Sequence, residues 1–219
     1  MSDTNTNRPR GGLMISFEGS EGCGKTTQIK RLETRLEDAG YNVTATREPG
    51  GTDVGEEIRH LLKYSHQGSR IFPETELLLF AAARAQLVRE VILPSIEQGR
   101  IILCDRFLDS TTVYQGIGRQ VSDDPIQVIN EFAIGDIMPD LTVVLDVPEE
   151  LSMQRVQERH SGPPDRFEQE SIDFYAKVRK GYLLLAESMP DRFVVMDGTL
   201  DRKLIEDEIW MYLRERFKL

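Results

Sequence analysis

A glycine-rich segment near the start of the chain is the strongest indication of the fold: residues 19–26 read Gly19-Ser20-Glu21-Gly22-Cys23-Gly24-Lys25-Thr26. This segment matches the pattern G-x-x-x-x-G-K-[ST], whose glycines let successive backbone N–H groups turn inward around phosphate oxygens. A helix that begins at the end of such a loop adds its positive N-terminal end at the same place. The segment therefore predicts a Walker A loop, which binds the phosphates of a nucleoside triphosphate.

Two side chains of the loop suit particular parts of a bound triphosphate. Lys25 can bridge the β- and γ-phosphates, and the hydroxyl of Thr26 can coordinate the Mg²⁺ ion that accompanies the nucleotide. The residues that we expect to contact ATP are Gly19, Ser20, Glu21, Gly22, Cys23, Gly24, Lys25, Thr26 and Thr27. The loop says little about what the triphosphate is used for.

Apolar runs with the length of buried strands alternate along the chain with longer helical patterns. The predicted strands are 13–18, 42–46, 100–104, 141–147 and 193–196. The predicted helices run from the loop to about residue 39, from about residue 52, from 73 towards 99 with a kink at Pro94, and over 126–134, 149–159, 169–188 and 200–217. This alternation predicts an α/β protein with the P-loop NTPase fold: a five-stranded parallel sheet with helices on both faces and a small lid.

Neither an internal repeat nor a linker divides the sequence. Residues 1–12 are polar and end in glycine, so we expect a disordered N-terminal tail followed by a single P-loop domain over 13–219. The cluster Ser161-Gly162-Pro163-Pro164 separates two helical segments and is flanked by arginines. A cluster of helix-breaking residues suits a mobile lid, which we place at about residues 155–170.

The overall composition excludes several classes of protein. The formal net charge of −10 argues against the basic face that nucleic-acid binding needs. The sequence has neither an apolar run of membrane-spanning length nor the apolar centre of a secretory signal, so we expect a cytoplasmic protein with no membrane span. Two cysteines do not make a disulfide scaffold, and the three histidines lack the spacing of a zinc site.

Four segments together resemble the thymidylate kinase family. They are FEGSEGCGKTT at 17–27, TREPGGT at 46–52, LFAAAR at 79–84 and DRFLDSTTVYQG at 105–116, and a fifth, DRFEQE at 165–170, falls where the family has its lid. The resemblance covers about residues 13 to 200. It implies a kinase domain that transfers the γ-phosphoryl group of ATP to dTMP with Mg²⁺, giving ADP and dTDP for dTTP biosynthesis, and it implies a homodimer.

Arginines follow two of the predicted strands, where ligands gather in α/β sheets. Arg47 ends the second strand, and Asp105 and Arg106 follow the third. A guanidinium can hold a phosphate through two hydrogen bonds. The resemblance makes Arg47 and Arg106 clamps on the dTMP phosphate, with Glu48 supporting Arg47. On local sequence alone, Arg47 remains equally consistent with a surface arginine beside a turn.

Phe80 and Arg84 lie four residues apart on a predicted helix and therefore share a face. The resemblance has the ring of Phe80 stack on thymine while Arg84 donates to its O4 atom. Judged by itself, a phenylalanine such as Phe80 is more often a core residue than a residue that stacks on a ligand. Arg84 lies among alanines, which makes a packing role harder to argue.

The resemblance assigns further residues to the dTMP site. Thr111 would meet the N3 atom of thymine, supported by Ser110 and Gln115, and Tyr114 would pack below the sugar. Glu21 would lie near the sugar 3′-hydroxyl. Asp105 would join Thr26 around Mg²⁺ or position the phosphate-bearing end of dTMP.

The lid contains Arg155, Arg159 and Arg166, whereas the Walker A loop contains no arginine. An arginine can offset the charge that develops during phosphoryl transfer. Some thymidylate kinases supply it from the loop and others from the lid, so we expect the lid type here. Arg159 and Arg166 are the preferred candidates, and the sequence does not choose between them. They complete the expected catalytic set: Lys25, Arg47, Arg106, Arg159 and Arg166.

Two other functions remain open on the sequence alone. A deoxynucleoside kinase or another small-molecule kinase of the same fold would need a base near a hydroxyl acceptor instead of arginines for a phosphate. A regulatory P-loop ATPase is the second alternative. The guanine-recognition motif N-K-x-D is absent from the sequence.

Overall fold

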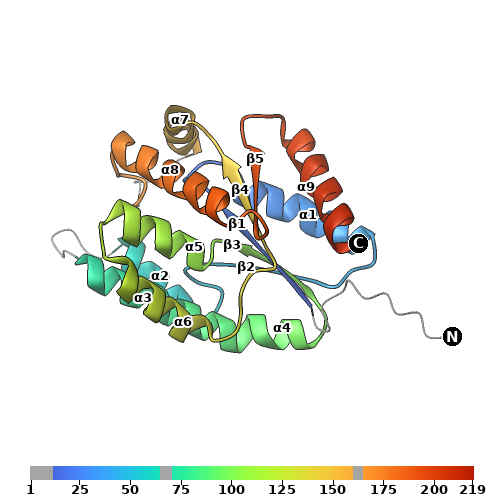
Figure 1. Ribbon diagram of the computed structural model, residues 1–219, viewed down its shortest axis with the longest axis horizontal. Coiled ribbons are helices and arrows are strands. Elements are labelled where there is room, and N and C mark those ends of the chain that lie inside the picture. The colour runs from blue at the N-terminus through green and yellow to red at the C-terminus, as the bar shows by residue number, and fades with distance from the viewer. Residues whose placement is uncertain (1–11, 65–70, 160–164) are drawn as a thin grey trace.

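The computed structural model describes residues 12–64, 71–159 and 165–219, and of Arg159 it describes the backbone alone. Within these residues, five parallel strands form one sheet in the order β2-β3-β1-β4-β5. The strands are β1 Leu13–Glu18, β2 Val43–Arg47, β3 Ile101–Asp105, β4 Leu141–Asp146 and β5 Phe193–Asp197. The predicted five-stranded parallel sheet with helices on both faces is confirmed (Figure 1).

The helices of the described residues follow the alternation expected from the sequence. They are α1 Lys25–Asp38, α2 Asp53–Tyr64, α3 Pro73–Leu87, η1 Val88–Ile92, α4 Leu93–Glu97, α5 Leu108–Thr111, η2 Thr112–Gly118, α6 Asp123–Ile134, α7 Glu149–Arg159, α8 Ile172–Ser188 and α9 Arg202–Phe217. In none of them is the apolar stretch long enough to cross a membrane.

Strand β1 lies at the centre of the sheet and is buried along its whole length. Successive side chains of a strand point to opposite faces, so Ile15 and Phe17 pack under α1 and α9, whereas Met14 packs under α3, η1 and α5. This two-sided burial explains why the strand is an unbroken apolar run. Ser16 and Glu18 are polar exceptions on the second face, and both are buried.

The carboxyl ends of three strands meet at one edge of the sheet. Phe17 pairs with Asp105, and Arg47 pairs with Asp105 from the other side. The chain leaves β1 at this edge through the glycine loop and leaves β3 through Arg106. The parallel register therefore brings together segments that are about 30 and 60 residues apart in the sequence, as expected at strand ends in α/β sheets.

The helix that the sequence predicts from 73 towards 99 departs from regular geometry earlier than expected. Instead of a kink at Pro94 itself, the π-helical turn η1 intervenes at Val88–Ile92, and α4 follows it. Proline lacks an N–H group and its ring clashes with the carbonyl four residues before it, so the irregular turn lies on the N-terminal side of Pro94. The prediction of one kinked helix is corrected to this three-part element.

Two further helices begin later than the sequence predicts, and both begin at a capping side chain. Ser171 accepts the N–H of Phe174 and starts α8 at Ile172, and Asp201 accepts the N–H of Lys203 and starts α9. The expected tail lies outside the described residues except for Gly12, whose N–H donates to the carbonyl of Ile96. The centre of the expected lid, 160–164, also lies outside them.

Candidate active site

The glycine loop wraps around the side chain of Lys25, the first residue of α1. The Nζ atom of Lys25 is buried and donates to the carbonyl oxygens of Ser20 at 2.9 Å and Gly19 at 3.2 Å. An ammonium group enclosed by a loop at a helix N-terminus produces a concentrated positive potential. An anion in the loop would therefore lie beside the ammonium group of Lys25.

Two glycines of the loop are required by close approaches of neighbouring backbone. At Gly19, with φ 132°, a Cβ atom would lie 2.6 Å from the carbonyl oxygen of Leu145. At Gly22, with φ 73°, it would lie 2.7 Å from the carbonyl oxygen of Ser152 on α7. The Ser152 hydroxyl also donates to Ser20 Oγ at 3.0 Å. Helix α7, which leads into the lid region, is thus packed directly on the loop.

Thr26 and Asp105 come from different elements and meet at this edge. The Thr26 hydroxyl donates to Asp105 Oδ2 at 2.6 Å. Mg²⁺ prefers oxygen ligands and is commonly held in proteins by one or two side chains together with phosphates and water. A hydroxyl and a carboxylate in contact beside a phosphate-binding loop fit this ion. No cluster of three or more His, Cys, Asp or Glu side chains arranged for a metal occurs among the described residues.

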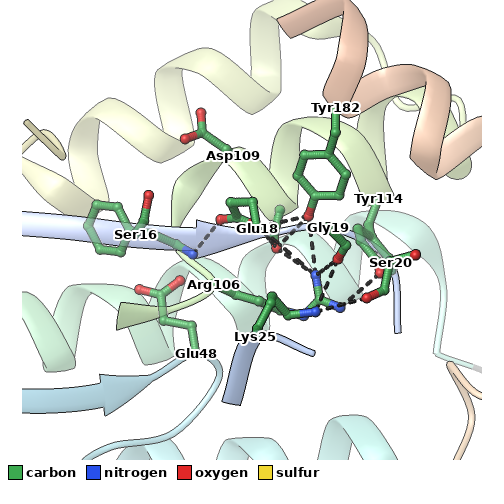
Figure 2. A network of polar contacts seen from close by, with 12 residues as sticks. Ser16, Glu18, Gly19, Ser20, Lys25, Glu48, Arg106, Asp109, Tyr114 and Tyr182 are labelled. Carbon is green, nitrogen blue, oxygen red and sulfur yellow. Dashed lines mark hydrogen bonds and ion pairs between the residues drawn. The ribbon is translucent and has the colours of Figure 1, made fainter. Parts of the chain in front are cut away.

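Arg106 follows β3 in the left-handed region, with φ 72°. Few residues other than glycine adopt this conformation, and those that do concentrate at functional sites. Its guanidinium is turned towards the glycine loop, where Nη1 donates to the Gly19 carbonyl at 3.0 Å (Figure 2). Its Nη2 atom donates to Glu21 Oε1 at 2.7 Å. The same Gly19 oxygen accepts from Lys25, so the two cations converge on one atom.

These cations determine the charge of Glu21. Burial by itself would raise the pKa of this carboxyl, but the positive charges of Arg106, Lys25 and Lys63 outweigh burial and lower the pKa to about 2. Glu21 is therefore an anion at neutral pH, held beside the loop.

A second pair of arginines lies near the end of β2. Arg47 Nη2 contacts Glu56 Oε1 of α2 at 2.8 Å, and Arg59 Nη1 of α2 donates to the Pro49 carbonyl at 2.8 Å. Burial, and next the charge of Arg47, lower the pKa of Arg59. Two guanidiniums close enough to repel one another would both be stabilised by a shared anion. The sequence analysis does not single out Arg59, although Glu56, Arg59 and Lys63 share a helix face at spacings of three and four residues.

Glu48 has a different partner from the one expected from the sequence. It does not support Arg47; its Oε2 atom accepts from Arg84 Nε at 2.8 Å, and both side chains are buried. The guanidinium of Arg84 also donates to Asn130 Oδ1 at 2.7 Å and to Thr111 Oγ1 at 2.9 Å. Arg84 is 1 % exposed and lies behind the cleft wall that Thr111 and Phe80 line.

The burial of Glu48 makes its charge sensitive to pH near neutrality. Burial raises the pKa of Glu48 to about 7 although Arg84 opposes the change, and its Oε1 atom has no hydrogen-bond partner among the described residues. The ordinary value is 4.5. A carboxyl with a higher pKa in the folded chain contributes stability that is complete below about pH 4.5 and is lost as pH rises through about 7.

Glu48→Gln is expected to remove this dependence. The free energy of unfolding of the variant minus that of the wild type should rise by about 3 kcal/mol between about pH 4.5 and about pH 8, because one pKa unit corresponds to about 1.4 kcal/mol. Urea unfolding across this range measures the difference. Glu57→Gln, at an exposed carboxyl of α2, is the control. A difference between Glu48→Gln and wild type that stays constant with pH would contradict the assignment.

An aromatic wall borders the cleft. The ring of Phe80 lies 5.9 Å from that of Phe167, edge to face, and Phe167 lies 6.4 Å from Tyr114. Phe80, Tyr114, Gln115 and Phe167 line the cleft. The structure thus brings Phe80 to the cleft as well as to a cluster of apolar side chains. Phe167 is not among the site residues predicted from the sequence, because the charged residues of its segment, DRFEQE, carry the resemblance there.

The lid arginines occupy different positions. Arg155 lines the cleft, and its Nη1 atom donates to the Gly198 carbonyl at 3.0 Å. Arg166 instead contacts Glu76 Oε2 at 2.5 Å through Nη2 and donates to the Leu62 carbonyl through Nε at 3.1 Å. Glu76 is a buried carboxylate that also accepts from Gln115 Nε2 at 2.7 Å. The side chain of Arg159 lies outside the described residues.

One continuous cleft of about 1190 Å³ joins these features. It runs from Arg155, Gly198 and Arg202, past the glycine loop, to Phe80 and Gln115. Its volume exceeds the ~300–1,000 Å³ of a site for one small ligand. The cleft therefore has room for two ligands placed end to end, with Lys25 and Arg106 at their junction.

The sequence of this chain matches one known protein family over most of its length. The family model described as thymidylate kinase matches residues 17–209. Two relatives named thymidylate kinase are similar: that of Thermoanaerobacter sp. (strain X514), 48% identical with 90% of this chain and 95% of the relative covered, and that of Citrifermentans bemidjiense, 50% identical with 87% and 86% covered.

A solved structure agrees with the sequence relatives. The crystal structure of thymidylate kinase from Ehrlichia chaffeensis superposes with a TM-score of 0.74 at 34% sequence identity. The match covers 93% of this chain and 99% of that one.

Proposed function

The chain belongs to the thymidylate kinase family, and from that premise we propose how its residues transfer the γ-phosphoryl group of ATP to dTMP, giving ADP and dTDP. The observation that carries the proposal is the convergence of Lys25 Nζ and Arg106 Nη1 on the carbonyl oxygen of Gly19, at 3.2 and 3.0 Å. Each cation belongs to a different half of the cleft. A donor phosphate on the lysine and an acceptor phosphate on the arginine would meet there.

The donor half is built from the glycine loop and the start of α1. Its backbone N–H groups and Lys25 bind the β- and γ-phosphates of ATP, and the adenosine end extends towards Arg155, Gly198 and Arg202. Thr26 and Asp105 would hold Mg²⁺. When bound, the ion neutralises charge on the β- and γ-phosphate oxygens.

The acceptor half takes dTMP. Arg106, Arg47 and Arg59 hold its phosphate, and the base lies between Phe80 and the wall of Thr111, Tyr114 and Gln115. Arg84 acts from behind this wall through Thr111, to which it donates at 2.9 Å. Glu21, kept ionised, accepts from the sugar hydroxyl or from Arg106.

No general base is needed for this reaction, because the attacking atom is an oxygen of a phosphate that is already an anion near neutral pH. Catalysis then comes from alignment of the two phosphates and from electrostatic stabilisation of the transferred group. Lys25 and Arg106 provide both the alignment and the electrostatic stabilisation. Carbonyl and carboxylate acceptors hold the two cations in place before the substrates bind.

A lid arginine supplies the remaining positive charge in the proposal. Arg159 and Arg166 remain the candidates. As the lid closes, Arg166 would have to break its ion pair with Glu76 and contact the transferred phosphoryl group instead. A closing lid also excludes water from the reaction.

We propose a cytoplasmic homodimer that forms through α3 and α6. Large apolar side chains of these helices are exposed, with Phe132 84%, Val128 64% and Leu78 56% exposed. An apolar face of this kind on a soluble domain favours association with a second copy. The free thiols Cys23 and Cys104 support a reducing compartment.

Phe132→Glu is expected to convert the dimer into single chains, because it places a charge in the apolar interface. Light scattering coupled to size exclusion measures the mass. Met211→Glu, at an exposed apolar residue of α9, is the control and should leave the dimer intact. A wild-type protein that runs as a single chain would contradict the proposal.

The proposed reaction is tested by coupled ADP release with a panel of acceptors: dTMP, dUMP, thymidine, dCMP, AMP and GMP. We expect dTMP to be the best acceptor and thymidine to be inactive, because the arginines need a phosphate. The kcat/KM for dUMP should be about 10- to 200-fold lower than that for dTMP, which is the usual effect of losing one methyl group from an apolar pocket. Phosphorylation of thymidine but not dTMP would contradict the proposal.

A further inference from the structure

We propose that Tyr182 positions the acceptor phosphate by holding one edge of the Arg106 guanidinium, an inference that rests on the function proposed above. Tyr182 lies on α8, is 1 % exposed, and points its hydroxyl into the corner between β1 and Arg106 (Figure 2). It belongs to none of the motifs in the sequence. Its hydroxyl nevertheless contacts two ionisable groups of the site.

The first of these groups is the buried carboxylate of Glu18, at the end of β1. Its Oε2 atom accepts the Tyr182 hydroxyl at 2.7 Å and the Ser110 hydroxyl at 2.6 Å, and its Oε1 atom accepts the N–H of Phe107 at 2.7 Å. Each hydroxyl has one proton and donates it to Glu18, and the two hydroxyl oxygens lie 2.9 Å from each other. The lone pairs of the two hydroxyl oxygens therefore remain free to accept from a donor on their other side.

That donor is Nη1 of Arg106. It lies 3.2 Å from the Tyr182 hydroxyl, 3.2 Å from the Ser110 hydroxyl and 3.0 Å from the Gly19 carbonyl. These three acceptors belong to α8, α5 and the glycine loop. A nitrogen held from three elements fixes where the guanidinium lies and how its plane is turned.

The other edge of Arg106 has different partners. Its Nη2 atom donates to Glu21 Oε1 at 2.7 Å and to the Tyr114 hydroxyl at 3.0 Å, and both of these residues line the cleft. A phosphate entering the cleft can exchange with them. Two of the three partners of Nη1, the Tyr182 hydroxyl and the Gly19 carbonyl, belong to buried residues outside the cleft lining, whereas both partners of Nη2 line the cleft. Nη1 is therefore the anchored edge, and Nη2 is the edge that exchanges partners.

The ring of Tyr182 is well placed to act as an anchor because its helix cannot shift easily. A Cβ atom at Gly181 would lie 2.8 Å from Ile117 and 3.0 Å from Val113, so α8 packs tightly on η2 at this point. The Tyr182 ring also packs 6.5 Å from that of Tyr114. A guanidinium fixed in this way loses less freedom when it binds phosphate, which is the usual gain from pre-organisation.

Tyr182→Phe tests the inference, since it removes the hydroxyl and keeps the ring. Steady-state assays should show kcat/KM for dTMP lower by about tenfold, the usual effect of losing one hydrogen bond to a charged group. Thymidine carries no phosphate and is expected to compete with dTMP for the base pocket. Its inhibition constant and the KM for ATP should change by less than about twofold. An effect confined to the phosphate-bearing acceptor is one that a general loosening of the fold would not produce.

Tyr175→Phe is the matched control. Tyr175 lies on the same helix and is also buried, but its hydroxyl has no hydrogen-bond partner among the described residues. All three constants should stay at wild-type values, and thermal unfolding should show both variants folded. The inference is overturned if Tyr182→Phe keeps wild-type kcat/KM for dTMP, or weakens dTMP, ATP and thymidine alike. A wild type that fails to phosphorylate dTMP would instead overturn the proposed function itself.

Discussion

Replacing Lys25 with alanine is expected to lower kcat by about 10³-fold or more. Lys25 Nζ is buried against the carbonyl oxygens of Gly19 and Ser20, at the junction of the two halves of the cleft. Charge on the transferred phosphoryl group develops there, and removing one pre-organised donor from such a site costs about 10²–10³ in rate before the loss of ATP binding is added. Coupled ADP release at saturating ATP and dTMP measures the change.

Lys177→Ala is the control for this experiment, because Lys177 is exposed on α8. It should keep wild-type kcat. Circular dichroism and the unfolding midpoint establish that Lys25→Ala is folded. A folded Lys25→Ala protein with wild-type turnover would show that Lys25 of the glycine loop does not take part in the reaction.

The second large effect is expected at Arg106. Arg106→Lys keeps a positive charge but loses the planar pair of N–H edges, so Gly19, Tyr182 and Glu21 cannot all be satisfied at once. The affinity for dTMP should fall by about 10²-fold, whereas that for thymidine should change little. Calorimetric titration of each ligand measures both affinities.

Arg35→Lys is the matched control, since Arg35 pairs with Glu206 and Asp207 between α1 and α9, on the other face of the sheet. It should leave both affinities unchanged. Equal losses for dTMP and thymidine in Arg106→Lys would show that the residue supports the fold and does not hold the phosphate.

Local pattern is enough to predict the sheet and the glycine loop. The run Leu13–Glu18 is apolar because both faces of the central strand are covered, and the loop residues must be glycine where Leu145 and Ser152 approach their backbone. The apolar pattern repeats along one strand, and the positive φ angles of Gly19 and Gly22 are local backbone conformations that favour glycine. Both therefore leave a signature in the sequence.

Contacts between distant segments leave no such signature. Glu48 follows Arg47 directly, which makes Arg47 its expected partner, yet it pairs with Arg84, which is 36 residues away. Tyr182 and Glu18 are 164 residues apart and meet only because α8 packs beside the end of β1. The partner of a charged side chain depends on the register of the sheet and on how helices pack, and neither can be read from one sequence.

The position of Arg166 shows a second feature of the site that one sequence does not predict. The sequence predicts an arginine in the lid, but the choice among Arg155, Arg159 and Arg166 depends on which of them a carboxylate already holds. Glu76, buried at the start of α3, contacts Arg166 at 2.5 Å. Nothing in the residues around Glu76 marks it as a partner of the lid.

The claim that one cleft holds two phosphorylated ligands end to end is tested most directly by calorimetry with dTMP, with and without saturating ADP. We predict one dTMP bound per chain in both titrations, because the two nucleotides occupy separate halves that meet between Lys25 and Arg106. Heat from ADP but none from dTMP, or displacement of ADP by dTMP, would contradict the account.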